Sequence, residues 1–108
     1  MSKDAPAPYA IAGKETILAT AEARVTLMTL DPGQGIPPHR HGAVTDHTFC
    51  LSGTAAVVLR DPEETLQLSP GDRAMVPPGR VHEVANRGDA PARLLLVQGP
   101  GAYDFQPA

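Results

Sequence analysis

Three of the four histidines lie close together in the chain, between His39 and His47, and the fourth, His82, follows a Pro-Pro-Gly turn. In a strand, residues two apart point to the same face, so His39 and His41 can present two imidazoles side by side. A first-row metal ion binds neutral imidazole nitrogens, often with one carboxylate, and keeps positions open for water or substrate. With Asp46 nearby, these residues have the types and spacing of a metal-binding set.

Short strands would have to position these side chains. After Ala23, apolar runs of strand length alternate with turn signals such as Asp31-Pro32-Gly33 and Pro77-Pro78-Gly79. Regularly spaced short strands favour a sandwich or a barrel. No segment after Ala23 keeps a helical period between its prolines, each of which would cost a helix interior about 3 kcal/mol. Only residues 13–23 can form a helical turn or, instead, a first strand.

Composition excludes several classes of function. The 108 residues are about the size of one domain and carry a formal net charge of −3, without a basic run that would contact phosphate backbones, so we expect no nucleic-acid partner. No apolar stretch approaches the roughly 20 residues that span a bilayer, and residues 1–9 lack the plan of a secretory signal. The single cysteine, Cys50, cannot form an internal disulfide. We therefore expect a cytoplasmic protein with no membrane partner.

Two segments resemble the two sequence motifs of the cupin superfamily. The first motif reads G-x5-H-x-H-x(3,4)-E-x6-G, and the residues at its spacing are Gly33, His39, His41 and Gly53. The second motif reads G-x5-P-x-G-x2-H-x3-N, and it is matched at every fixed position by Gly71, Pro77, Gly79, His82 and Asn86. The motifs occur in the expected order, and with the hairpin-length stretch between them, residues 54–70, they cover roughly half of the chain.

The resemblance implies an all-β fold, an antiparallel β-barrel of the cupin, double-stranded β-helix or jelly-roll kind. It also implies a metal ion at the mouth of the barrel and, frequently, a homodimer. We expect an N-terminal arm and first strand or turn over residues 1–22, of which the first eight residues are an arm without chemistry, and the cupin barrel over residues 23–108. Tyr103 and Phe105 would close one end of the barrel or pack on a partner subunit.

The fourth metal ligand is where the sequence departs from the first motif, because the glutamate position holds Asp46. Aspartate is one methylene shorter, so its carboxylate would reach the ion with some backbone movement or through a water molecule, and a three-histidine site is the alternative. His47 faces the other side of a regular strand unless a bulge reverses the strand. The expected ligands are thus His39, His41, Asp46 and His82, with His47 as an alternate.

Strand alternation also fixes expectations for the neighbouring side chains. If Asp46 faces inward, Thr48 and Cys50 do too, and Cys50 is then a small buried residue rather than a ligand or nucleophile. Three arginines are expected to be solvated charges, namely Arg40, Arg73 and Arg80.

A metal site inside an apolar barrel can polarise a bound oxygen or lower the pKa of bound water. The leading hypothesis is a metal-dependent enzyme acting on a small oxygen-bearing organic molecule, with dioxygenase chemistry ahead of isomerase, lyase or hydrolytic chemistry. Fe, Mn, Ni and Zn all remain open as the single divalent ion. The alternatives are a non-catalytic cupin module that binds or senses a small ligand, and a metal that merely staples the fold, because fold does not settle function.

Overall fold

The structure is a computed structural model that describes residues 10–108, so the arm predicted over the first eight residues lies outside the described range. Within residues 10–108 the chain forms strands and turns only, and none of it is a helix that could cross a membrane. The segment at Gly13–Ala19 is a strand, β1, which decides between the two structures predicted there. The division of the chain at residue 22 stays a prediction.

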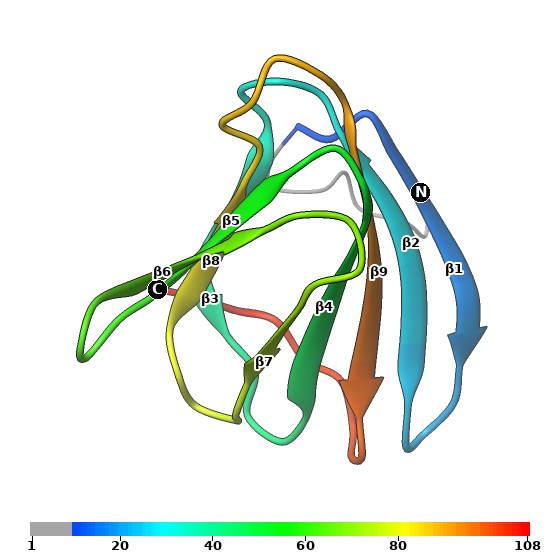
Figure 1. Ribbon diagram of the computed structural model, residues 1–108. Coiled ribbons are helices and arrows are strands. Elements are labelled where there is room, and N and C mark those ends of the chain that lie inside the picture. Colours follow the sequence, from blue (N-terminus) through cyan, green and yellow to red (C-terminus); the bar gives the residue numbers. More distant parts are fainter. Residues whose placement is uncertain (1–9) are drawn as a thin grey trace.

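The described strands form two five-stranded antiparallel sheets that face each other (Figure 1). The first sheet has the order β1-β2-β9-β4-β7, where the added strands are β2 Arg24–Leu30, β9 Ala92–Gly99, β4 Thr45–Ser52 and β7 Arg73–Val76. The second sheet has the order β10-β3-β8-β5-β6, with β10 Gln106–Pro107, β3 Gly35–Arg40, β8 His82–Ala85, β5 Ala55–Leu59 and β6 Glu64–Leu68. The predicted antiparallel jelly roll is confirmed, but as two facing sheets, because no hydrogen-bonded ladder joins them within the described strands.

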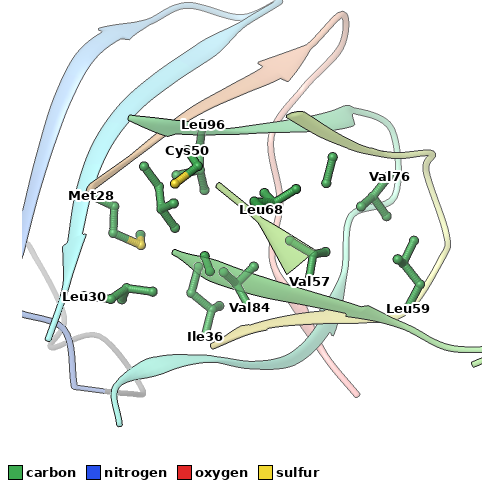
Figure 2. Packing of buried hydrophobic residues seen from close by; sticks show 13 residues of the cluster. Met28, Leu30, Ile36, Cys50, Val57, Leu59, Leu68, Val76, Val84 and Leu96 are labelled. Carbon is green, nitrogen blue, oxygen red and sulfur yellow. The ribbon is translucent and has the colours of Figure 1, made fainter. Parts of the chain in front are cut away.

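The apolar core fills the space between the two sheets. On β2, Met28 and Leu30 point inward and alternate with half-buried outward residues, as the period of two of a strand requires. Figure 2 shows them packed near Ile36 and Val84 of the opposite sheet. Each such side chain contributes roughly 1.5–3 kcal/mol when it is fully buried, so the facing sheets form a rigid scaffold for polar groups at one end.

Residues at the fixed positions of the two motifs hold turns at both ends of the sheets. Gly79 has a φ of +83°, and its N–H donates to the carbonyl of His41 over 2.8 Å. Gly53 also has a positive φ, of +71°, and a Cβ there would collide with the carbonyl of Pro91. Asn86 is buried, and its amide donates to the carbonyls of Leu30 and Ala90 over 2.9 and 2.8 Å. These three motif residues therefore connect loops and strands.

Candidate metal centre

The four residues predicted as metal ligands lie together and are all buried. His39 lies on β3, His41 directly follows that strand, Asp46 lies on β4 and His82 begins β8. One nitrogen or carboxylate oxygen of each residue lies within 4.8 Å of those of the other three. We call these four residues the histidine–aspartate cluster.

Strand pairing explains how residues so far apart in sequence meet. In the second sheet His39 lies directly opposite His82, on the antiparallel neighbours β3 and β8. In the first sheet Asp46 lies opposite Gln98 of β9. The register of β3 shifts between Ile36 and His39, where the chain carries two prolines. Proline is tolerated at such irregular positions of a sheet, and the irregularity re-aims the following side chain.

Asp46 is the acceptor at the centre of the cluster. Its Oδ2 lies 3.1 Å from Nε2 of His41, 3.3 Å from Nε2 of His82 and 3.3 Å from the side-chain nitrogen of Gln98. Thr48 approaches the other carboxylate oxygen at 3.5 Å. The aspartate that replaces glutamate in the motif thus reaches both imidazoles directly.

The other ring nitrogen of each histidine is bound to a backbone carbonyl. Nδ1 of His39 lies 2.8 Å from the oxygen of Pro37, and Nδ1 of His82 lies 3.0 Å from that of Arg80. Nδ1 of His41 lies 2.6 Å from the oxygen of Asp104, in the C-terminal segment. A carbonyl can only accept, so each Nδ1 carries a proton. In His41 and His82 the other nitrogen, Nε2, faces Asp46. It donates to the carboxylate when it is protonated, and it offers a lone pair to a metal ion when it is not.

Burial and hydrogen bonding shift the pKa values of the cluster residues in opposite directions. Burial lowers the pKa of His39 to about 4, which keeps this imidazole neutral near pH 7. Burial alone would lower the pKa of His41, but the hydrogen bonds with Asp46 and with the carbonyl of Asp104 raise it overall. Burial alone would raise the pKa of Asp46, but the bonds from His41 and His82 hold that pKa well below its usual range.

The donor set fits a divalent transition metal. When each metal–ligand bond is about 2.1 Å long, two ligand atoms at right angles lie about 3.0 Å apart, close to the distances between Asp46 and its two imidazoles. Three imidazoles and one carboxylate leave coordination positions for other ligands on an ion that takes five or six. The cluster therefore has the chemistry and the spacing of a metal centre.

A cavity of about 330 Å³, counting its open mouth, lies beside the cluster and is lined by both His39 and His41. Its apolar wall comes from Met28, Ile36, Leu96 and Phe105, and its polar wall from Lys14, Arg24, Thr26, Gln98 and Tyr103. The ring of Phe105 stacks on that of His39 with centroids 4.5 Å apart. Small-molecule sites are typically concave and mostly apolar, with a few convergent polar groups.

The neighbours of the cluster follow the predicted alternation. Thr48 and Cys50 are buried on the inner face of β4 beside Asp46. His47 lies on the outer face of that strand, opposite Met75 and Val97, and is absent from the cluster.

Of the three arginines expected to be solvated, Arg40 and Arg73 are exposed. Arg80 differs from that expectation, because it is half-buried and donates to the backbone oxygens of Arg60 and Pro62.

Sequence reasoning missed the residues that support the cluster. Gln98 ends the apolar alternation of β9 as an inward polar side chain, and that pattern was the available signal. Asp104, whose carbonyl binds His41, lies in a segment without a pattern of its own. Tyr103 and Phe105, which were expected to close one end of the barrel or to pack on a partner subunit, both line the cavity.

Comparison with known proteins agrees with the motifs. The model of the cupin domain matches residues 26–98, and the chain belongs to the cupin family. The protein TT1209 from Thermus thermophilus is 31% identical with a TM-score of 0.75, over 82% of this chain and 83% of that one. A Klebsiella pneumoniae protein with a double-stranded β-helix domain is 28% identical with a TM-score of 0.76, over 88% of this chain and 84% of that one.

Curated relatives are longer proteins. Germin-like protein subfamily 2 member 1 of Arabidopsis thaliana is 37% identical over 89 residues, which make up 75% of this chain and 41% of that protein. Mannose-1-phosphate guanylyltransferase RfbM of Salmonella typhimurium is 32% identical over 79 residues, or 73% of this chain and 16% of that protein. The chain thus spans less than half the length of these two relatives.

Proposed function

We propose that this cupin binds one divalent transition metal ion through the histidine–aspartate cluster and is an enzyme acting on a small oxygen-bearing organic molecule. The observation that carries the proposal is the arrangement of the three imidazoles. Each is buried and has Nδ1 occupied by a carbonyl, and the cluster holds one ligand atom of each ring within 4.8 Å of the others and of Asp46, beside a cavity. In proteins generally, a hydrogen bond from the other ring nitrogen orients a histidine that binds a metal ion.

When bound, a divalent ion would polarise an oxygen atom of the substrate. The residues of the chain would bind the ion, orient its ligands and shield the cavity from water. Asp46 contributes negative charge that offsets part of the charge of the ion, and Gln98 holds the carboxylate in place. Met28, Ile36 and Leu96 supply an apolar wall, which lowers the local dielectric constant and strengthens electrostatic interactions in the cavity.

Dioxygenase-like chemistry is proposed ahead of isomerase or lyase chemistry because, among the described residues, the cavity offers no carboxylate and no imidazole outside the cluster as a general base, although Lys14 and Tyr103 line it. Apart from the two histidines of the cluster, no Asp, Glu, His or Cys lines the cavity within the described residues. Cys50 is turned away, with its thiol toward the carbonyls of Ser52 and Gly53. Oxygen chemistry needs a redox-active ion, so zinc in the native protein would favour the isomerase or lyase alternative.

Elemental analysis by plasma mass spectrometry tests the metal site directly. We expect one ion per chain in the wild type and almost none in His39→Ala or Asp46→Ala. His47→Ala is the matched control, because His47 adjoins Asp46 on β4 but lies on the opposite face. A full metal content in Asp46→Ala would reduce the site to three histidines. A wild type that contains no metal as isolated and takes up none when metal is added at neutral pH would refute the proposal.

Oxygen uptake then separates an enzyme from a binding module. For an enzyme, uptake or conversion of an oxygen-bearing substrate should rise in proportion to metal occupancy. Binding without turnover across a broad substrate panel would favour the sensing module.

We also propose that the chain forms a homodimer, as the family resemblance implies. Four large apolar side chains are about half exposed, and all lie on strands of the first sheet, namely Ile17, Leu18, Leu51 and Met75. Between the outer strands of that sheet, Leu27, Leu95 and Val97 are half-buried on the outer face. Association of two such faces would remove this apolar surface from water.

A further inference from the structure

The cavity beside the cluster has a positively charged wall. Its lining contains two basic side chains, Lys14 and Arg24, from the adjacent strands β1 and β2, and no Asp or Glu among the residues that the structure describes. The carboxylate of the cluster, Asp46, does not line the cavity and already accepts hydrogen bonds from His41, His82 and Gln98. A cavity of this kind attracts anions, even though the whole chain has a net charge of −3.

Arg24 is held against an aromatic ring and not against an acid. Its Cζ atom lies 4.4 Å from the centroid of the Tyr103 ring, and the ring centroids of Tyr103 and His41 lie 5.4 Å apart. Between residues 10 and 108, no carboxylate forms an ion pair with Arg24. Stacking fixes the plane of a guanidinium while leaving its N–H donors free to bind a ligand. Arg24 and His41 thus contact the same ring beside one cavity.

We propose that this cavity binds a small organic acid whose carboxylate is held by Arg24 and whose second oxygen is a ligand of the metal ion. The inference rests on the proposed function, since it assigns the substrate class of that metal site. A carboxylate matches the planar donors of arginine with two parallel hydrogen bonds. The apolar wall of Met28, Ile36 and Leu96 accommodates a short hydrocarbon chain between these two anchoring points.

Calorimetric titration of the metal-loaded protein tests the inference with named probes. Glycolate, lactate and malonate are the acids, and glycolamide is a neutral molecule of nearly the same shape as glycolate. The variants are Arg24→Gln, which removes the charge, and Arg24→Lys, which keeps the charge but loses the planar donors. Arg93→Gln is the matched control, because Arg93 is an exposed arginine on β9 outside the cavity. Metal content is measured on every sample.

We expect at least one acid to bind equally well to the wild type and to Arg93→Gln. The same acid should bind about tenfold or more weakly to Arg24→Gln, and its affinity for Arg24→Lys should lie in between. Glycolamide should bind about tenfold or more weakly than glycolate. Unchanged metal content in the Arg24 variants shows that they are folded and that the cluster is intact. Equal binding by Arg24→Gln, equal binding of glycolamide, or no binding of any acid to the metal-loaded wild type would overturn the inference.

Two further outcomes separate this inference from its premises. Inorganic phosphate that binds as tightly as the acids, with the same dependence on Arg24, would overturn the carboxylate class and leave a general anion site. A wild type that holds no metal but binds the acids through Arg24 would refute the metal site and keep the anion site. A wild type that binds metal but none of the acids would keep the metal site and refute the anion site.

Discussion

At the scale of single residues, the polar groups around Asp46 decide how well the cluster can hold a metal ion. Asp46 accepts from two imidazoles and from Gln98, and it lies directly opposite Gln98 in the ladder between β4 and β9. The amide of Gln98 is the one donor of these three that is not itself a candidate ligand. It would keep its bond to the carboxylate when a metal ion binds.

Gln98→Leu removes this donor while keeping a similar volume. Second-sphere partners of metal ligands typically change metal affinity by 10–100-fold, so we expect about a tenfold loss, measured by competition with a chromophoric chelator. Gln67→Leu, on the exposed part of β6, should bind metal like the wild type. Unchanged affinity in Gln98→Leu would mean that the carboxylate needs no support from β9.

Burial lowers the reactivity of the Cys50 thiol. Burial, followed by the negative charge of Asp72, raises the pKa of this thiol above its ordinary value of 9.0. At pH 8 the native protein should therefore react with a thiol-specific disulfide reagent at least about a hundredfold more slowly than the unfolded chain. Equal rates would show that the thiol is exposed.

The same shift gives stability a pH dependence with a definite sign. Because the folded pKa of Cys50 lies above the unfolded value, the folded state keeps its proton in a range where the unfolded state has lost it. The stabilisation is complete below pH 9.0 and is lost as the pH rises through the folded pKa. Denaturant unfolding should show a decline above pH 9 that is smaller in Cys50→Ala.

At the scale of elements, the segment after β9 supports the cluster from the edge of the second sheet. Its Asp104 supplies the backbone carbonyl for His41, and its carboxylate accepts from the backbone of Gly42 over 2.7 Å and from Gln106 over 2.7 Å. The short strand β10 then pairs with β3 opposite His39 and Arg40. The segment is thus tied to the strand that carries His39 and leads directly into His41.

Asp104→Ala would loosen this attachment without removing the carbonyl. We expect a metal affinity about tenfold lower, because His41 loses part of its orientation. Asp89→Ala is the control, since Asp89 is exposed in the turn between β8 and β9. If both variants bind metal like the wild type, the segment does not position His41.

Elements also show how far the sequence determines the site. The alternation of β4 places Asp46 inward and His47 outward because a regular strand has a period of two, and β4 is regular at those positions. The partners Gln98 and Asp104 could not be found in this way. Their contacts depend on β9 pairing with β4 and on the C-terminal segment crossing His41, and such long-range neighbours leave no local pattern in the sequence.

At the scale of the whole molecule, the fold should survive without the metal ion. The core between the sheets is extensive, and within the described residues no buried side-chain nitrogen or oxygen lacks a hydrogen-bond partner. Chelation should therefore leave one cooperative thermal transition. We expect the Tm of the chelated protein to lie roughly 10 °C or more below the Tm measured at a metal concentration of 100 Kd. Complete unfolding on chelation would instead assign the ion a structural role.

Association through the first sheet is the second prediction at this scale. Light scattering after size exclusion should give the mass of a dimer for the wild type. Leu18→Glu combined with Met75→Glu places charges on the two outer strands of the sheet, where both side chains are about half exposed, and should give a monomer with full metal content. The control is Thr65→Glu on the other sheet. A wild-type monomer would exclude the homodimer.

The hydrogen bond between His41 and the carbonyl of Asp104 has a consequence for biosynthesis. The two residues are 63 positions apart, and the other two histidines have their carbonyl partners only two residues away. As the chain leaves the ribosome, His39 and His82 can therefore be oriented locally, whereas His41 must wait for translation of the segment around Asp104. The last imidazole of the cluster is fixed only then, so a nascent chain should acquire its full affinity for metal late in its synthesis.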